Sequence, residues 1–191
     1  MVVNWSRFAN YTHMIPRAEA DAMGVRVLPD GSIQMDKPMP QAGTPFAVAT
    51  APFWSPLMIP CTEPPFGKIA VVDLDQRKIV WERSLGTSRD SGPLRIPSHI
   101  PLPMGVPNMG GTLTTKSGLI FVSATQEQAF RAFDIRDGRK LWSVRLPAGG
   151  QATPMTFVSP RTGRQYVVLA VGGNFSLMSK MGDYIIAYAL P

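Results

Sequence analysis

Two pairs of adjacent glycines, each beside a polar or polarisable side chain, are the segments of this chain best suited to hold a ligand. Met109 precedes Gly110-Gly111, and Asn174 follows Gly172-Gly173. Because glycine has no Cβ, such pairs let the backbone approach a flat group closely, while a methionine thioether can cover a ring face. Asparagine donates and accepts hydrogen bonds but does not titrate. The alternative for Met109-Gly-Gly is a tight turn that opens a structural unit.

Other catalytic and metal chemistries have few candidates. No Lys-Ser/Thr pair follows Gly172-Gly173-Asn174, so this segment is not a phosphate loop. The two histidines, His13 and His99, give no credible Ser/His/Asp arrangement, and together with Cys61 they supply too few ligands for structural zinc. We therefore assign no catalytic residue and no metal ligand to this chain. The triplet Asn4-Trp-Ser6 fits the glycosylation pattern, but such triplets arise easily by chance.

A repeated motif indicates the elements that must position these loops. In each copy an apolar run ends in aspartate, a polar turn follows, and tryptophan is the eighth residue after the aspartate; the pairs are Asp73 with Trp81 and Asp134 with Trp142. Each copy predicts strand, tight turn and strand, with the indole on the second strand. Such a unit cannot bury its own apolar face, and a large indole suits packing between neighbouring sheets. The repeat therefore predicts an all-β fold built of β-propeller blades.

Composition supports a mostly β globular chain and excludes several classes of protein. The 191 residues are 45% hydrophobic and 17% charged, and the 19 prolines and 17 glycines fit many short strands joined by turns. The net charge of +6 is scattered, without the basic stripe of a nucleic-acid surface. No apolar run reaches the roughly 18 residues of a membrane span, and the N-terminus lacks the features of a signal peptide. A single cysteine excludes an internal disulfide framework.

Strand and turn signals divide the chain into three segments. Residues 1–67 predict a loop-rich excursion with one helix over residues 17–23. Residues 68–151 predict two Trp-motif blade units, the second with strands near 111–115, 118–124, 129–135 and 139–146. Residues 152–191 predict an incomplete last blade, one strand short, with an unpaired sheet edge. About two and a half blades cannot close a ring, so we expect a partial β-propeller, a C-terminal fragment that is poorly soluble alone.

The Trp repeat occurs together with three further segments: GVPNMGGT from Gly105, LPAGGQATPM from Leu146 and KMGDYIIAYALP from Lys180. In combination these segments resemble the C-terminal part of the membrane-bound, PQQ-dependent quinoprotein glucose dehydrogenases. The similarity extends over nearly the whole chain and includes PRAEAD from Pro16. A Trp repeat alone also occurs in non-catalytic propellers, whereas the combination is specific.

The resemblance implies an eight-bladed propeller that holds pyrroloquinoline quinone (PQQ) near its axis. A divalent cation, Ca or Mg, lies beside the cofactor and is held mainly by residues outside this chain. The implied reaction is oxidation of glucose or another aldose to the lactone, with ubiquinone as electron acceptor. In this family the propeller lies on the periplasmic face of the bacterial inner membrane, and the membrane anchor and the aspartate that acts as base precede the matched part. The remaining blades of the propeller are then partners of this chain, which we expect to be inactive alone.

The resemblance also points to individual residues of a cofactor-binding wall. Met109, followed by Gly110 and Gly111, corresponds to the place where related alcohol dehydrogenases have an aromatic residue near the quinone. Glu127 matches an acidic residue near the cofactor of the glucose enzymes; the alternative is a solvent-exposed glutamate at a hairpin end. Asn174 replaces a histidine that some members use near the quinone, a departure that bears on cofactor affinity.

Two other functions fit a partial propeller. A non-catalytic scaffold for protein–protein contacts in the cell envelope could use the same Trp repeat, and a decayed or truncated gene product would have no activity alone. The glycine-rich loops at matching blade positions, Gly110-Gly111 and Gly172-Gly173, favour the enzyme, because a scaffold does not need them. Trp-bearing blades and an apolar anchor encoded upstream of Met1 would decide between these functions.

Overall fold

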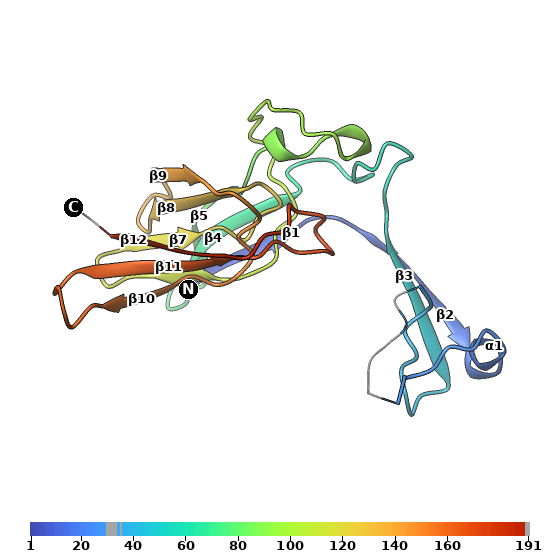
Figure 1. Ribbon diagram of the computed structural model, residues 1–191. Coiled ribbons are helices and arrows are strands. Elements are labelled where there is room, and N and C mark those ends of the chain that lie inside the picture. Colours follow the sequence, from blue (N-terminus) through green and yellow to red (C-terminus); the bar gives the residue numbers. More distant parts are fainter. Residues whose placement is uncertain (30–33, 35, 190–191) are drawn as a thin grey trace.

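The computed structural model describes residues 1–29, 34 and 36–189, and it has three antiparallel sheets that lie side by side (Figure 1). The strand orders are β1-β4-β5, β6-β7-β8-β9 and β10-β11-β12, and β2 and β3 form a separate two-stranded sheet. The strands are β1 (Val2–Ser6), β2 (Asn10–Pro16), β3 (Phe46–Pro52), β4 (Gly67–Asp73), β5 (Lys78–Ser84), β6 (Thr112–Thr114), β7 (Leu119–Val122), β8 (Ala129–Asp134), β9 (Lys140–Arg145), β10 (Met155–Val158), β11 (Gln165–Val171) and β12 (Tyr184–Ala189).

The second sheet is the four-stranded unit that the sequence predicts over residues 111–146. Its strands pair antiparallel in chain order. Asp134 ends β8, and its Oδ1 accepts the backbone N–H of Arg136 at 2.9 Å. Asp73 ends β4 in the same way and accepts the N–H groups of Asp75 and Gln76, both at 2.9 Å. The aspartate of each motif copy therefore satisfies the backbone of the turn that follows it.

The first sheet differs from the expectation for residues 1–67. β1 pairs antiparallel with β4, from Val2 opposite Val71 to Ser6 opposite Gly67, so the start of the predicted excursion is a blade strand. The partner strand is far along the sequence, and no local turn marks the pairing. A short strand of this kind gives little signal in the sequence, which is why the prediction missed it.

Each motif tryptophan lies between its own sheet and the next one. Trp81 on β5 donates from Nε1 to the carbonyl of Ile135 at 2.7 Å, and a Cβ added at Gly138 would lie 2.7 Å from the indole ring. Trp142 on β9 makes an edge-on contact with Tyr188 of β12, with ring centroids 5.2 Å apart. The predicted placement of the two indoles between neighbouring sheets is confirmed.

The two tryptophans differ in a way that can be measured. Among the described residues, the Nε1 of Trp142 makes no hydrogen bond, whereas that of Trp81 satisfies a carbonyl. We expect Trp81→Phe to lower the free energy of unfolding by about 1–2 kcal/mol, because the Ile135 carbonyl loses its donor. Trp142→Phe, which loses similar ring area, is the matched control and should cost less. Denaturant midpoints of the two variants measure the difference, and equal losses would contradict the hydrogen bond's role.

Two clusters of buried side chains hold the three sheets together. The cluster between the first and second sheets includes Ile69, Leu85, Ile120, Val122 and Phe133. The cluster between the second and third sheets includes Phe130, Leu146, Val167, Leu169 and Val171. Burial of these side chains supplies the main favourable term for packing one sheet on the next. Loops at one end of the sheets are thereby held close to one another.

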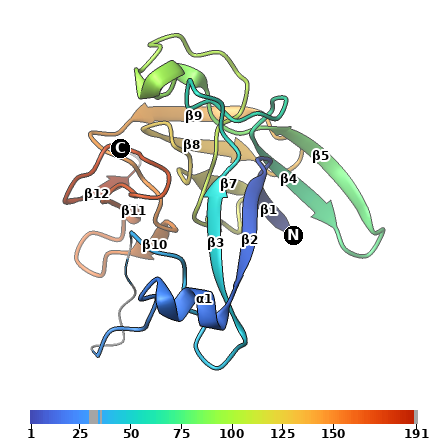
Figure 2. The same cartoon turned by 90° about the vertical axis from the view of Figure 1, so that its right-hand side faces the viewer.

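β2 and β3 form an arm that projects away from the three sheets (Figures 1 and 2). Its own small core consists of Ile15, Ala20, Val25 and Ala47. Helix α1 (Arg17–Ala22) follows Pro16 and ends just before Gly24, which has a φ of +69°, so the predicted helix is confirmed. Arg17 donates to the carbonyls of Pro40 at 2.6 Å and Phe46 at 2.8 Å. The described part of residues 1–67 therefore contains three strands and a helix, more regular structure than the predicted loop-rich excursion.

Candidate functional site

The loop that carries Met109 is fixed by polar side chains of β1. Asn4 donates from Nδ2 to Asn108 Oδ1 at 2.8 Å and to the carbonyl of Gly110 at 3.0 Å. Ser6 Oγ donates to the Asn108 carbonyl at 3.0 Å and accepts the Asn108 N–H at 2.9 Å. Side chains alternate along a strand, so Asn4 and Ser6 share one face of β1. These bonds join the first and second sheets and hold the backbone on both sides of Met109.

Sequence reasoning missed Asn4, Ser6 and Asn108 as positioning residues. The interpretation of Asn4-Trp-Ser6 as a chance glycosylation triplet took no account of the strand that contains it. The available signal was a pair of polar residues at alternate positions in a short apolar segment, which places both on one face of a strand.

Met109 and Asn174, which come from distant parts of the sequence, lie next to each other. Asn174 Nδ2 is 3.6 Å from Met109 Sδ, a contact with a weak acceptor. The Asn174 loop is itself fixed, because the Asn174 backbone N–H donates to Ser179 Oγ at 2.8 Å and its Oδ1 accepts the Leu177 N–H at 3.0 Å. Met109 is 49% exposed. The structure thus presents a thioether and an amide N–H together at the ends of two neighbouring sheets.

Gly110 and Gly111 lie against the segment that leads into the third sheet. A Cβ at Gly110 would lie 2.0 Å from the Gln151 carbonyl oxygen, and Gly110 has a φ of +128°. A Cβ at Gly111 would lie 2.5 Å from Thr153 Oγ1, which accepts the Gly111 N–H at 3.1 Å. The close approach that requires these glycines is therefore between sheets. Gly173 is also closely packed, but within one loop: a Cβ there would lie 2.5 Å from the carbonyl oxygen of Lys180, which belongs to the same β11–β12 connection.

Glu127 is buried, with 6% exposure, so the alternative of a solvent-exposed glutamate at a hairpin end is wrong. Its carboxylate accepts the Thr87 backbone N–H at 2.7 Å and the Thr87 hydroxyl at 2.8 Å, and it forms an ion pair with the buried guanidinium of Arg131. Burial lowers the pKa of Arg131, and the charge of Glu127 opposes that shift. No described contact joins Glu127 to Met109 or Asn174. Its assignment to a cofactor site stays a prediction.

A second ion pair lies beside Glu127 and ties the excursion after β5 to the second sheet. Asp90 accepts two hydrogen bonds from Arg145, both at 2.7 Å, and the backbone N–H of Gln128 at 2.8 Å. Burial alone would raise the pKa of Asp90, but the hydrogen bonds from Arg145 and Gln128 outweigh it and leave the pKa below its ordinary value. We call Asp90, Arg145, Glu127 and Arg131 the ionic clasp.

The lowered pKa of Asp90 predicts a loss of stability in acid. The pKa of Asp90 in the folded state lies below the unfolded value of about 3.9. The ionised carboxylate therefore stabilises the fold above about pH 4, and this stabilisation is lost as the pH falls through the folded-state pKa. We expect Asp90→Asn to lower stability at pH 7 and to weaken the pH dependence below about pH 4. Urea midpoints measured from pH 7 to pH 2 test this. Asp75→Asn, on an exposed turn, is the control, and identical acid profiles for wild type and Asp90→Asn would refute the prediction.

The described residues contain no group of three or more His, Cys, Asp or Glu side chains placed to hold a metal ion. The expectation that a divalent cation is held mainly outside this chain stays a prediction. Within the described part of the chain, no helix has the length and apolar character needed to cross a membrane.

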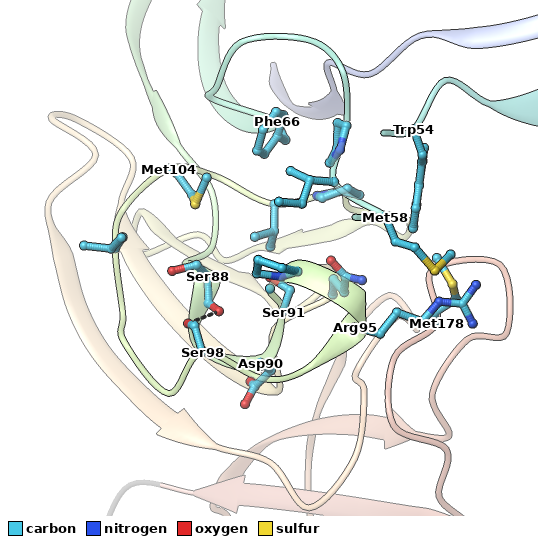
Figure 3. A pocket seen from close by; sticks show the side chains of 18 residues that line it. Trp54, Met58, Phe66, Ser88, Asp90, Ser91, Arg95, Ser98, Met104 and Met178 are labelled. Atoms are coloured by element: carbon cyan, nitrogen blue, oxygen red, sulfur yellow. Dashed lines mark hydrogen bonds between the residues drawn. The ribbon is translucent and has the colours of Figure 1, made fainter. Parts of the chain in front are cut away.

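A cavity of about 250 Å³ lies next to the loops of Met109 and Asn174 (Figure 3). Much of its wall comes from the excursion between β5 and β6, which contains two short 3₁₀ helices, η1 (Ser88–Asp90) and η2 (Pro93–Arg95). Pro107 and Met178 also line it, and they belong to the loops that carry Met109 and Asn174. The cavity therefore adjoins the loops that carry Met109 and Asn174.

Antiparallel sheets packed side by side with indoles between them are blades of a β-propeller, and this is the class of protein that the fold defines. The family model for the beta-propeller domain of PQQ-type glucose/ethanol/alcohol dehydrogenases matches residues 1–167. The chain belongs to this family, whose cofactor is PQQ, and the predicted family, fold class and cofactor are confirmed.

Curated relatives include enzymes with several substrates. The chain is 48% identical over 153 residues to a probable quinate dehydrogenase (quinone) of Xanthomonas campestris pv. juglandis. The aligned region covers 80% of this chain and 19% of that protein. It is 48% identical over 155 residues to quinoprotein glucose dehydrogenase A of Acinetobacter calcoaceticus, again 80% and 19%. Identity to the quinoprotein glucose dehydrogenase of Escherichia coli is 43% over 178 residues, a region that covers 93% of this chain and 22% of that protein. The chain thus spans about a fifth of the length of these relatives.

Two solved structures share the fold. The quinohemoprotein alcohol dehydrogenase of Comamonas testosteroni matches with a TM-score of 0.52 and 20% identity over 95% of this chain and 23% of that one. A europium-containing methanol dehydrogenase matches with a TM-score of 0.50 and 20% identity, over 90% of this chain and 23% of that one. At this identity the likeness supports the propeller fold alone.

Proposed function

We propose that this chain forms part of the wall of a PQQ site in a dehydrogenase that oxidises glucose or another aldose to the lactone and passes electrons to ubiquinone. The observation that carries the proposal is the meeting of Met109 and Asn174 at the ends of two neighbouring sheets, in a chain of the PQQ family. The remaining blades, the membrane anchor and the base that removes the substrate proton belong to the rest of the enzyme, on the periplasmic face of the inner membrane.

The residues present fit one side of such a site. PQQ is a planar, tricarboxylic quinone, so it needs a polarisable surface for its ring and hydrogen-bond donors for its oxygens. Met109 offers the first, and Asn174 Nδ2, whose one described acceptor is a sulfur atom, offers the second. When bound, PQQ accepts the electrons of the substrate. The protein's part is to hold the ring in place and to exclude water from it.

Each candidate residue has a defined part in this proposal. Met109 covers a ring face and Asn174 donates to a cofactor oxygen, which requires no titration at this position. Gly110 and Gly111 let the Met109 loop lie against the third sheet, so they set the position of the thioether. Glu127 acts on the site through the ionic clasp, which holds the excursion after β5.

Quinate is the second candidate substrate. Identity to the probable quinate dehydrogenase equals identity to the Acinetobacter glucose dehydrogenase, 48% in both cases. Both substrates carry a ring hydroxyl that a quinone cofactor can oxidise. The described residues form part of the proposed cofactor wall. None of them distinguishes glucose from quinate by shape.

Dye-linked turnover of the complete natural polypeptide that carries these residues tests the proposal. After loading with PQQ and Ca²⁺ or Mg²⁺, we expect PQQ-dependent oxidation of glucose. Turnover of quinate without turnover of glucose would replace the aldose with the second candidate. Absence of PQQ-dependent turnover with either compound would contradict both candidate substrates, and absence of PQQ binding as well would favour a scaffold. The isolated chain is expected to be inactive.

A further inference from the structure

The cavity beside the loops of Met109 and Asn174 combines an apolar wall with one arginine (Figure 3). Phe66 and Val106, both buried, belong to the apolar wall, and the exposed Arg95 lines the cavity as well. The volume of about 250 Å³ is close to the lower end of the range for ligand pockets, about 300–1,000 Å³. A molecule of one ring therefore fits the cavity better than an extended ligand.

Most polar side chains around the cavity already have partners within the protein. Ser88 Oγ donates to the Ile100 carbonyl at 2.7 Å, and Ser98 Oγ donates to the Ser88 carbonyl at 2.6 Å. Gln126 Nε2 donates to the Leu177 carbonyl at 3.0 Å. These side chains are therefore largely engaged in holding the excursion between β5 and β6 and the loop of Asn174.

Arg95 and Ser91 are the exceptions. Among the described residues, neither the Arg95 guanidinium nor the Ser91 hydroxyl makes a hydrogen bond, and Arg95 forms no ion pair, although both side chains line the cavity. Asp90 is the one carboxylate among the described lining residues, and its charge is already compensated by two hydrogen bonds from Arg145, both at 2.7 Å. The cavity therefore carries an uncompensated positive charge next to a hydroxyl donor.

The backbone around Arg95 is held in an unfavourable conformation. Arg95 has a φ of +64°, and two other lining residues, Met58 and Met178, have φ values of +60° and +53°. The side chains of these three residues lie on one side of the cavity (Figure 3). The Leu94 N–H donates to the Leu57 carbonyl at 2.7 Å, which joins the segments of Arg95 and Met58. Non-glycine residues in this region of φ cost energy and cluster at sites that bind ligands, so this side of the cavity has the character of a binding site.

We propose that this cavity binds the carboxylate of the substrate, with the Arg95 guanidinium and the Ser91 hydroxyl as donors. The proposal rests on the proposed function and narrows its substrate class to ring polyols that carry a carboxylate: quinate, or a uronic acid among the aldoses. A guanidinium binds a carboxylate through paired, charge-assisted hydrogen bonds. Met178, which lines the cavity with Arg95, belongs to the loop of Asn174. A ring anchored by its carboxylate therefore lies next to the proposed cofactor wall.

The test compares charged and neutral ligands on the complete natural polypeptide. The pairs are quinate with its methyl ester and glucuronate with glucose, and each pair differs in the carboxylate. Equilibrium dialysis of the apo form gives the Kd values, and dye-linked turnover of the PQQ-loaded form gives kcat and KM. We expect the carboxylate that fits the cavity to bind about tenfold more tightly than its neutral counterpart.

Variants assign this preference to individual side chains. Arg95→Gln should abolish the preference for the charged ligand, Arg95→Lys should keep part of it, and Ser91→Ala should weaken binding of the carboxylate about threefold. Arg161→Gln removes one positive charge from the exposed turn between β10 and β11 and is the matched control. It should leave all Kd values unchanged.

The outcomes separate this proposal from the proposed function. Equal Kd values within both pairs would overturn the carboxylate site, and so would a preference that persists in Arg95→Gln, because another residue would then supply the charge. The comparison of ligands on the wild type decides the question even if Arg95→Gln fails to fold. If PQQ-dependent dye turnover is absent in the wild type, the proposed function fails, while the Kd values still decide whether the cavity takes a carboxylate.

Discussion

Replacement of Glu127 by alanine is expected to destabilise the protein by about 3–5 kcal/mol, because it leaves the buried guanidinium of Arg131 without a counter-charge. Arg131 is 5% exposed, and its remaining contacts, to Thr125 Oγ1 and to the Ala129 carbonyl, are both long at 3.4 Å. The backbone N–H of Thr87 loses its acceptor as well. Denaturant unfolding of the complete polypeptide measures the loss.

The surface ion pair of Lys68 with Glu82 provides the matched control. The Glu82 side chain is 33% exposed, so Glu82→Ala should cost less than about 1 kcal/mol. The double variant Glu127→Ala with Arg131→Met removes both charges and should be more stable than Glu127→Ala alone. If Glu127→Ala costs no more than Glu82→Ala, loss of the counter-charge of Arg131 is not the source of the expected destabilisation.

Gly110→Ala is expected to cost about 3 kcal/mol or more and to weaken PQQ binding. The new Cβ would lie 2.0 Å from the Gln151 carbonyl oxygen, and the residue has a φ of +128°, a conformation in which side chains are strained. Since both obstacles are backbone features, the Met109 loop must move to relieve the contact. That movement shifts the Met109 thioether out of the position from which it would cover the cofactor ring.

Gly43→Ala is the control for conformational strain alone. Gly43 has a φ of +80°, and nothing lies within 4 Å of an added Cβ. We expect a loss of about 1–2 kcal/mol and unchanged PQQ binding. Unfolding midpoints and PQQ titrations of both variants give the comparison. Similar losses for the two glycines would show that contact with Gln151 does not constrain the loop.

The sequence predicts most of the fold because its signals are local. Asp134 and Trp142 mark a strand, a turn and a second strand within a few residues, and the four strands of the second sheet follow the prediction closely. β1 was missed because its pairing with β4 joins segments far apart in the sequence, with no turn between them. The arm of β2 and β3 was missed for the same reason, since Asn10 pairs with Pro52 across a long insertion.

The candidate site was predicted in part. Met109 and Asn174 were selected from their glycine neighbours and from the family resemblance, and the structure brings them together. Their partners Asn4 and Ser179 could not be found in the same way, because single polar residues have many possible contacts and only the packed sheets select one. Glu127 was selected from the family resemblance alone, and the alternative of an exposed glutamate rested on average residue preferences, which do not anticipate a buried partner such as Arg131.

Titration of PQQ into the apo form of the complete polypeptide tests the central claim most directly. If Met109 and Asn174 face the cofactor, Met109→Ala and Asn174→Ala should each raise the Kd for PQQ about tenfold, while Ser117→Ala on an exposed turn should not change it. A Kd that stays at the wild-type value in both site variants would contradict a cofactor wall at these residues.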